Sequence, residues 1–264
     1  HPVFVWRDKP LRPMPSSPLT QDAPRVAGTA KVLMLCIEFT DVKHGASHTP
    51  AFFDNLADGP GNSMAAYFTQ SSTGKFTVSG DSFGWYCSTQ TMAHYGAPGG
   101  GQKDNPLLYQ LVTEAVQAAD AAVNFANYDA DKDGWVDYLQ IVHAGSDEAM
   151  TQIQNDIWSE MYYDFDTPTV DGKRVGMYSM VSENDPMGVL AHEFGHQIGM
   201  PDLYDTDGPG GGGETDGAGL WDIMAAGAFG GNGDVPSLPS AWSRALVGWA
   251  NVVTVTANRN SIPM

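Results

Sequence analysis

The chain has 264 residues, enough for one large domain or for a domain with two lobes around a cleft. Thirty-one acidic residues against 13 basic ones give a formal net charge of −18. Such a surface repels phosphate backbones and anionic lipid headgroups, so we expect neither nucleic acid nor membrane partners. The sequence contains no apolar run as long as a membrane span, so we expect no membrane insertion.

The N-terminal half predicts strands that alternate with helices. Residues 1–28 contain six prolines and little periodicity, which predicts an extended arm. A nearly continuous apolar run at 31–39 predicts a strand that is covered on both faces. Two short helices at 51–56 and 63–70 follow, and then a strand or hairpin at 76–85.

The middle of the chain continues this alternation. A glycine-rich stretch at 98–101 predicts a loop, and 105–122 predicts a helix with one apolar stripe. Strands are expected at 135–143 and 174–181. The alternation of helices and strands predicts an α/β layered fold.

The most informative stretch is 185–202, DPMGVLAHEFGHQIGMPD, which contains His192, Glu193 and His196 in the order HExxH. Residues four apart lie on one face of a helix, so both imidazoles can bind one metal ion. Glu193 adjoins the first ligand and can take a proton from a water molecule on the metal. The motif therefore predicts a zinc site with Glu193 as its general base.

Local signals place a helix here and end it at a defined residue. Asp185 is a good N-cap, and Pro186 suits the first helical position. Gly199 offers a left-handed stop that turns the chain back on itself. That reversal can bring Asp202 to the metal as the third ligand.

HEFGHQIGMPD resembles the extended metzincin signature in its Asp form, and the later GLWDIMAAG is similar to the immune inhibitor A family of secreted bacterial metalloproteases. The likeness in order and spacing extends over roughly residues 31–249. Metzincins carry a methionine in a tight turn beneath the metal, and Met224 matches it. The family also implies an edge strand on the cleft rim, for which we expect 176–181.

The resemblance implies a fold and a domain organisation. The expected fold is that of a metzincin-like zincin. It has a twisted mixed sheet and the active-site helix in an N-terminal lobe, and a smaller, loop-rich C-terminal lobe after Gly199. The catalytic domain is expected at 29–250, followed by a C-terminal strand or tail at 251–264. We also expect a secreted monomer that acts on protein or peptide substrates.

The implied activity is that of a zinc-dependent endopeptidase in which a metal-activated water attacks the peptide bond and Glu193 moves the proton. The alternative is an inactive, metal-stabilised binding or adhesion module. Glu193 favours the enzyme, because a purely structural site has no use for a base there. Tyr204 and Tyr178 are candidates for stabilising the oxyanion.

Glu214 is a rival third ligand, because gluzincin proteases complete their zinc site with a Glu on a later helix. Four consecutive glycines precede Glu214, however, and Asp216 and Gly217 follow it. This composition does not sustain a helix. Asp202 is therefore favoured.

A second cation site is expected in the acidic turn DADKDGWVD. Carboxylates at alternate positions around a glycine suit a hard cation such as Ca²⁺, although a solvated acidic turn has the same composition. The expected calcium ligands are Asp129, Asp131, Asp133, the carbonyl of Trp135, and Asp137. The pattern departs from an EF-hand, because Gln140 stands where the bidentate Glu belongs. A later acidic cluster has Asp205 and Asp222 at its ends. It is compatible with another Ca²⁺ site or with a mobile loop, and we do not choose between the two.

The remaining cysteines and histidines carry weaker signals. Cys36 and Cys87 leave open whether a disulfide forms, because the sequence does not show whether they meet. His143, at a strand end, is interpreted as a hydrogen-bonded structural residue. The remaining histidines fall in expected loops and are interpreted as surface residues: His44, His48 and His94.

Overall fold

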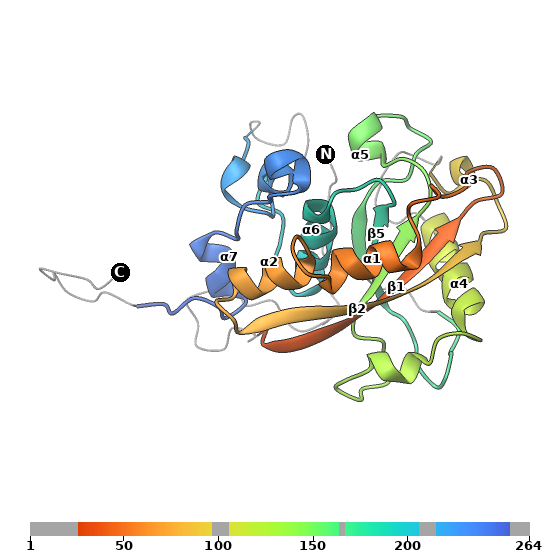
Figure 1. Ribbon diagram of the computed structural model, residues 1–264, viewed down its shortest axis with the longest axis horizontal. Coiled ribbons are helices and arrows are strands. Elements are labelled where there is room, and N and C mark those ends of the chain that lie inside the picture. Colours follow the sequence, from red (N-terminus) through yellow and green to blue (C-terminus); the bar gives the residue numbers. More distant parts are fainter. Residues whose placement is uncertain (1–25, 97–105, 164–166, 206–214, 254–264) are drawn as a thin grey trace, which may run out of the picture.

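The computed structural model describes residues 26–96, 106–163, 167–205 and 215–253, and these form a five-stranded mixed sheet covered by helices (Figure 1). The strand order is β2-β1-β3-β5-β4. Neighbours pair in parallel except β4 and β5, which are antiparallel. The strands are β1 (Gly28–Glu38), β2 (Phe76–Cys87), β3 (Leu139–His143), β4 (Glu160–Tyr163) and β5 (Met177–Ser182).

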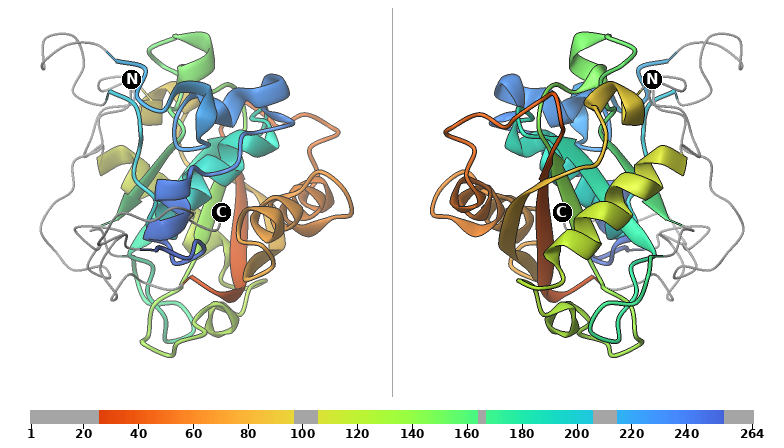
Figure 2. Two further views of the ribbon diagram at one scale, coloured as in Figure 1. Left: turned by 90° about the vertical axis from the view of Figure 1, so that its left-hand side faces the viewer. Right: turned by 90° about the vertical axis from the view of Figure 1, so that its right-hand side faces the viewer.

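Helices connect these strands and cover both faces of the sheet (Figure 2). The α-helices are α1 (Pro50–Asp58), α2 (Met64–Ser71), α3 (Met92–Gly96), α4 (Pro106–Ala119), α5 (Glu148–Thr151), α6 (Met187–Gln197) and α7 (Ala241–Leu246). The 3₁₀ segments are η1 (Phe125–Tyr128), η2 (Gly219–Trp221) and η3 (Ala226–Gly233).

Strand β1 divides the hydrophobic core into two layers, because successive side chains of a strand point to opposite faces. Val32, Met34 and Cys36 pack with α1, α2 and α6 on one face. Leu33, Leu35 and Ile37 pack with α4 on the other. The predicted strand, covered on both faces, is therefore confirmed, and so is the α/β layered class.

Helix α6 lies within the first of these layers, and the C-terminal element η3 packs beside it (Figure 1). Gly188 allows the close approach of η3. A Cβ at this position would lie 2.1 Å from the carbonyl oxygen of Ala228. The sheet on one side and η3 on the other therefore hold α6 in place.

Two strand predictions need correction. The strand expected at 135–143 begins only at Leu139, and Trp135 forms an isolated bridge with Arg174 instead. The segment 176–181 is not the edge strand, because β5 pairs with β3 on one side and with β4 on the other. The edge is β4, which the sequence analysis did not identify.

The helix start and the cysteines are also settled. Helix α6 begins at Met187, and Pro186 is its N-cap, so Asp185 is not the cap. The carboxylate of Asp185 instead accepts hydrogen bonds from the Ser182 amide and the Ser159 hydroxyl. Cys36 is buried and Cys87 is exposed, and both are free thiols, so no disulfide joins them.

Some predictions fall outside the described residues. They are the arm at 1–28, apart from its last three residues, the loop at 98–101, most of the tail at 251–264, and Glu214. Among the described helices, none is long and apolar enough to cross a membrane.

Candidate metal centre

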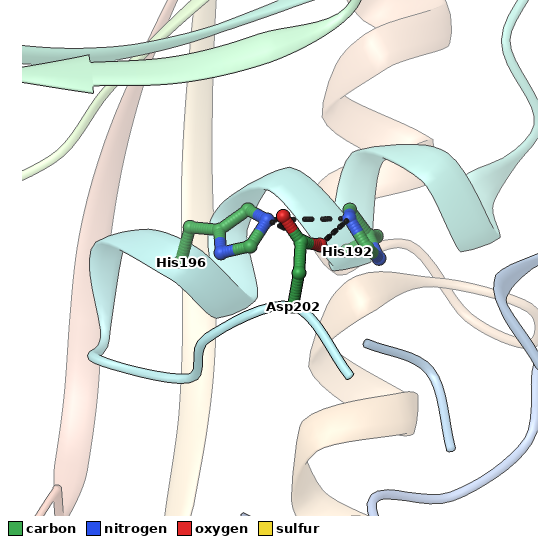
Figure 3. A group of neighbouring side chains, drawn as sticks. All are labelled: His192, His196 and Asp202. Atoms are coloured by element: carbon green, nitrogen blue, oxygen red, sulfur yellow. Dashed lines mark hydrogen bonds and ion pairs between the residues drawn. The ribbon is translucent and has the colours of Figure 1, made fainter. Parts of the chain in front are cut away.

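Helix α6 carries two of the three predicted metal ligands. All 11 of its residues are buried, as expected of a helix enclosed by the sheet and η3. His192 and His196 project from consecutive turns toward one point (Figure 3). Their Nε2 atoms lie 3.2 Å apart.

The third predicted ligand reaches this point through the turn that ends the helix. Gly199 has a φ of +98°, the left-handed conformation that glycine adopts most easily. The Gly199 amide donates to the His196 carbonyl at 2.9 Å, and the Met200 amide donates to the Gly195 carbonyl at 3.0 Å. The chain then reverses and places Asp202 opposite the two imidazoles (Figure 3).

The three donor atoms fit a small tetrahedral cation. Oδ1 of Asp202 lies 3.3 Å from Nε2 of His192 and 3.3 Å from Nε2 of His196. Donors bound at about 2.0–2.1 Å to tetrahedral zinc lie about 3.3–3.4 Å from one another. The observed spacing matches this arrangement on all three sides.

Hydrogen bonds on the far side of each imidazole fix which nitrogen faces the centre. Nδ1 of His192 donates to the Ile223 carbonyl at 2.7 Å, and Nδ1 of His196 donates to the Met200 carbonyl at 2.8 Å. A carbonyl only accepts, so each Nδ1 carries a proton and each Nε2 can present a lone pair. Such partners are typical of metal-binding histidines.

The electrostatics of the group favour a positive charge at its centre. Burial acts to lower the pKa of His192, but the Asp202 hydrogen bond and the charges of Glu193 and Asp202 raise it to about 9. Burial acts in the opposite sense on Asp202, whose pKa is nevertheless lowered by His196 and His192. Without metal, a proton supplies the positive charge that a cation would bring.

Glu193 lies beside this group but is not part of the close triad. Its Oε1 is 4.0 Å from Nε2 of His192. Its Oε2 is buried and accepts no hydrogen bond from the described residues. Burial, followed by the charge of Asp202, raises the pKa of Glu193 well above its usual range. The geometry suits a proton acceptor better than a fourth ligand.

Met224 lies against the middle of α6. It is fully buried, and a Cβ at Gly195 would lie 2.8 Å from its Sδ atom. Its backbone carbonyl accepts a hydrogen bond from Leu203, the residue after Asp202, at 2.7 Å. Met224 therefore packs against Gly195, the residue before His196, and its role as the methionine beneath the metal stays a prediction.

The two tyrosines proposed for the oxyanion lie in different places. The hydroxyl of Tyr178 donates to Glu160 at 2.5 Å, and the Tyr178 ring belongs to the core layer on the α4 side, away from α6. Tyr204 lies close to the centre. Burial and the carboxylates of Asp202 and Glu193 raise its pKa. Of the two, only Tyr204 retains this candidate role.

The predicted calcium loop brings three of its carboxylates together. One oxygen each from Asp129, Asp131 and Asp133 lie within 4.8 Å of one another. Several of these oxygens already accept hydrogen bonds from backbone amides of the same loop. The ammonium of Lys173 also lies 2.6 Å from Oδ2 of Asp129. The positive charge of Lys173 therefore already balances part of the negative charge of this loop.

Of the other two predicted ligands of that loop, Asp137 is placed less favourably. Asp137 accepts from the Ala130 amide at 2.7 Å and is outside the close group of carboxylates. Burial and the charges of Asp131, Asp129 and Asp133 raise its pKa. Trp135 has a half-exposed ring that lies under the Arg174 guanidinium.

The histidines outside the centre differ in their surroundings. His143 is fully buried, its Nδ1 donates to the Ala144 carbonyl, and burial lowers its pKa to about 4, as expected of a structural residue. His44 and His48 are not simple surface residues, because each Nδ1 lies 2.7 Å from a carboxylate, of Glu38 and Glu183 respectively.

The sequence analysis missed Asp222, which it counted among loop carboxylates. Asp222 is fully buried and accepts hydrogen bonds from Met224, Ser240 and Ser243. The available signal was its place inside the apolar run Leu220–Ala225, where an unpaired carboxylate would be costly.

Comparison with known proteins agrees with the geometry. The chain is 28% identical over 271 residues to the pre-pro-metalloprotease PrtV of Vibrio cholerae serotype O1, covering 82% of this chain and 29% of that protein. It is 27% identical over 288 residues to immune inhibitor A of Bacillus thuringiensis subsp. alesti, covering 85% and 41%. The chain thus spans less than half the length of these relatives. Residues 51–250 match the catalytic domain of the immune inhibitor A peptidases M6, and the chain belongs to this family of metallopeptidases.

Proposed function

We propose that this domain is a zinc-dependent endopeptidase in which His192, His196 and Asp202 bind the metal and Glu193 is the general base. The observation that carries the proposal is the buried triad of donor atoms, 3.2–3.3 Å apart, with both imidazole Nε2 atoms turned inward. Family membership supports proteolysis, and the spacing of the donors supports zinc.

Each residue then has a distinct part in peptide hydrolysis. Zinc, when bound, supplies a Lewis acid that polarises the scissile carbonyl and makes water a better nucleophile. Glu193 accepts a proton from the attacking water and delivers it to the leaving amine. Its burial beside the ligands keeps this carboxylate out of bulk solvent, where it would be more weakly basic. Tyr204, close to Asp202 and Glu193, donates to the developing oxyanion.

The same proposal covers the organisation of the chain. The sheet and α6 form an N-terminal lobe, and the segments after Gly199 form a smaller C-terminal lobe, as in metzincins. The catalytic domain corresponds to 29–250, between the Pro-rich arm and the C-terminal tail. The protein is a secreted monomer that acts on proteins. The likeness to the pre-pro-metalloprotease PrtV and to immune inhibitor A supports the action on proteins.

Substrate docking is reassigned to β4. This strand is the edge of the sheet on the side of β5 and α6, and no strand of the described residues pairs with its outer backbone groups. A peptide that adds a strand there gains main-chain hydrogen bonds that do not depend on its sequence. A complex with a peptide inhibitor should show these bonds on β4, and an inhibitor bound without contact to β4 would refute the assignment.

Calcium in the acidic loop is a second proposal. The carboxylate oxygens of Asp129, Asp131 and Asp133 converge, and burial together with the charges of these three residues raises the pKa of the nearby Asp137. Ca²⁺ prefers such oxygen ligands, with the carbonyl of Trp135 as a further one. Its expected effect is on stability, since the loop contributes no residue to the metal centre.

The proposed activity is tested by metal analysis combined with digestion of casein. We expect about one zinc per chain, loss of digestion with a zinc-selective chelator, and recovery when zinc is restored. Calcium stays present throughout, so that any effect on the acidic loop is held constant. Undiminished digestion by fully zinc-depleted protein would refute a zinc mechanism.

A further inference from the structure

Asp222 is a buried carboxylate outside the proposed ligand set. Asp222 is 0% exposed, and its carboxylate forms no ion pair with any described residue. Instead Oδ1 accepts a hydrogen bond from the Met224 amide at 2.8 Å. Oδ2 accepts from the Ser240 amide at 2.8 Å and from the Ser243 hydroxyl at 2.6 Å. These three donors compensate the burial of the carboxylate.

The turn that Asp222 holds contacts two of the proposed ligands. The carbonyl of Ile223 accepts the Nδ1 proton of His192 at 2.7 Å. The carbonyl of Met224 accepts the amide of Leu203, the residue after Asp202, at 2.7 Å. One turn therefore orients a histidine from α6 and also restrains the loop that carries the carboxylate ligand.

The carboxylate ties this turn to a separate part of the chain. Ser240 and Ser243 lie at the start of α7, and Ser243 is fully buried. Asp222 thus fixes the turn from both sides, through its own neighbour Met224 and through α7. Without these bonds, the turn would lose its link to α7 and would keep only local backbone bonds, such as the one from the Ala225 amide to the Asp222 carbonyl at 3.1 Å.

We propose that Asp222 is a positioning residue for the metal centre, setting the places of His192 and Asp202 through the Ile223 and Met224 carbonyls. The inference rests on the proposed function, because it assigns those two residues as zinc ligands. Hydrogen bonds around a metal centre typically change metal affinity roughly 10–100-fold when they are removed. Asp222 does not bond to a ligand itself, but the turn that it holds bonds to His192 and to Leu203, the residue after Asp202.

The decisive variant is Asp222→Asn, which keeps the shape of the side chain. Three donors converge on the two oxygens of Asp222, and an amide replaces one oxygen with a donor. At least one hydrogen bond is therefore lost and two donors face each other. We expect the zinc dissociation constant to rise roughly 10-fold or more. The visible absorption bands of the Co²⁺-substituted protein should shift, because ligand geometry changes.

Asp185→Asn is the matched control. Asp185 is also buried, and it also accepts from a backbone amide and a serine hydroxyl, those of Ser182 and Ser159. It lies before the start of α6, and among the described residues no hydrogen bond joins its carboxylate to a proposed ligand or to the Ile223 and Met224 turn. Both donors bond to Oδ2 of Asp185, so the amide oxygen of the variant can keep both hydrogen bonds. We expect its folding, zinc affinity and Co²⁺ spectrum to stay those of the wild type.

Ser243→Ala is the milder second variant, for use if Asp222→Asn does not fold. It removes one of the three hydrogen bonds to Asp222, and we expect a smaller change of the same kind in zinc affinity and Co²⁺ spectrum. The inference is overturned if the folded variants bind zinc like the wild type and give its Co²⁺ spectrum. If the wild type itself binds no zinc, the proposed function fails and the inference with it.

Discussion

Two groups of side chains in this molecule bring three possible metal ligands together, and they differ in what surrounds the donors. At the α6 centre, a backbone carbonyl accepts a hydrogen bond from Nδ1 of each histidine, and Nε2 of each histidine faces the carboxylate of Asp202. In the acidic loop, backbone amides and Lys173 already contact the carboxylates.

The contrast shows that convergence alone does not define a metal centre. At the α6 centre, hydrogen bonds fix the Nδ1 atoms of both histidines, and the buried Nε2 and carboxylate oxygen atoms face one another. Such an arrangement is strongly stabilised by a cation between these atoms. The loop carboxylates, of which only Asp129 is buried, already accept hydrogen bonds within their own loop and can do without a cation, although they still attract one. We therefore expect zinc to be essential at α6 and calcium to modulate stability at the loop.

The largest expected effect is on zinc binding. Asp202→Ala should raise the zinc dissociation constant at least roughly 100-fold, because it removes a ligand where loss of an outer partner alone costs 10–100-fold. Activity on casein should fall with it. Zinc titration with a competing chelator measures the change.

Glu214→Ala is the comparison for this variant, since Glu214 is the rival third ligand. It should leave zinc content and affinity near those of the wild type. Zinc retained by Asp202→Ala and lost by Glu214→Ala would assign the third ligand to Glu214. The three donors at α6 would then not be the zinc site.

The next effect concerns the acidic loop. Added Ca²⁺ should raise the melting temperature of calcium-stripped protein, because a ligand bound only to the native state stabilises it, by about 2.7 kcal/mol at 100 times its Kd. Asp131→Asn combined with Asp133→Asn should abolish the response. Lys173→Met should strengthen it, since the ammonium that contacts Asp129 is removed. If calcium addition leaves the melting temperature unchanged, the loop is a solvated acidic turn and not a calcium site.

The smallest effect concerns Glu160, a buried carboxylate whose partner is a hydroxyl and not a cation. Burial raises its pKa to about 7, although the Tyr178 hydrogen bond acts to lower it. A raised pKa means that the folded state holds the proton more tightly than the unfolded state. The contribution of Glu160 to stability is thus complete below the unfolded pKa and is lost as pH rises toward 7, by about 1.4 kcal/mol per unit of pKa difference.

Glu160→Gln tests this dependence, because an amide keeps an acceptor for Tyr178 but does not titrate. Unfolding should be measured between about pH 4.5 and 7 in a Glu193→Gln background, which limits self-digestion. The wild-type carboxylate should lose stability relative to the glutamine across this range. A constant difference between the two proteins would show that Glu160 titrates normally.

The sequence predicted that the three proposed ligands lie close together, because the geometry that joins them is local. His192 and His196 lie on one helix face, and Gly199 determines the reversal that brings Asp202 back. The strands with continuous apolar runs were also predictable. Burial on both faces leaves a clear pattern, as in β1.

The missed features depend on contacts between distant segments. Strand β4 is four residues long and forms because β5 offers an edge, which no local pattern in the sequence shows. Asp185 had the composition of an N-cap, but the Ser159 hydroxyl and Ser182 amide engage its carboxylate. Asp222 is compensated by donors from α7, 18 and 21 residues further along.

The central claim is most directly tested by Glu193→Gln, which keeps the shape of the side chain and removes the base. We expect wild-type zinc content and melting temperature, with casein hydrolysis reduced by at least roughly 100-fold, the usual scale of general-base catalysis. Near-wild-type hydrolysis by the zinc-loaded variant would contradict it, because the proton would then be taken by another group.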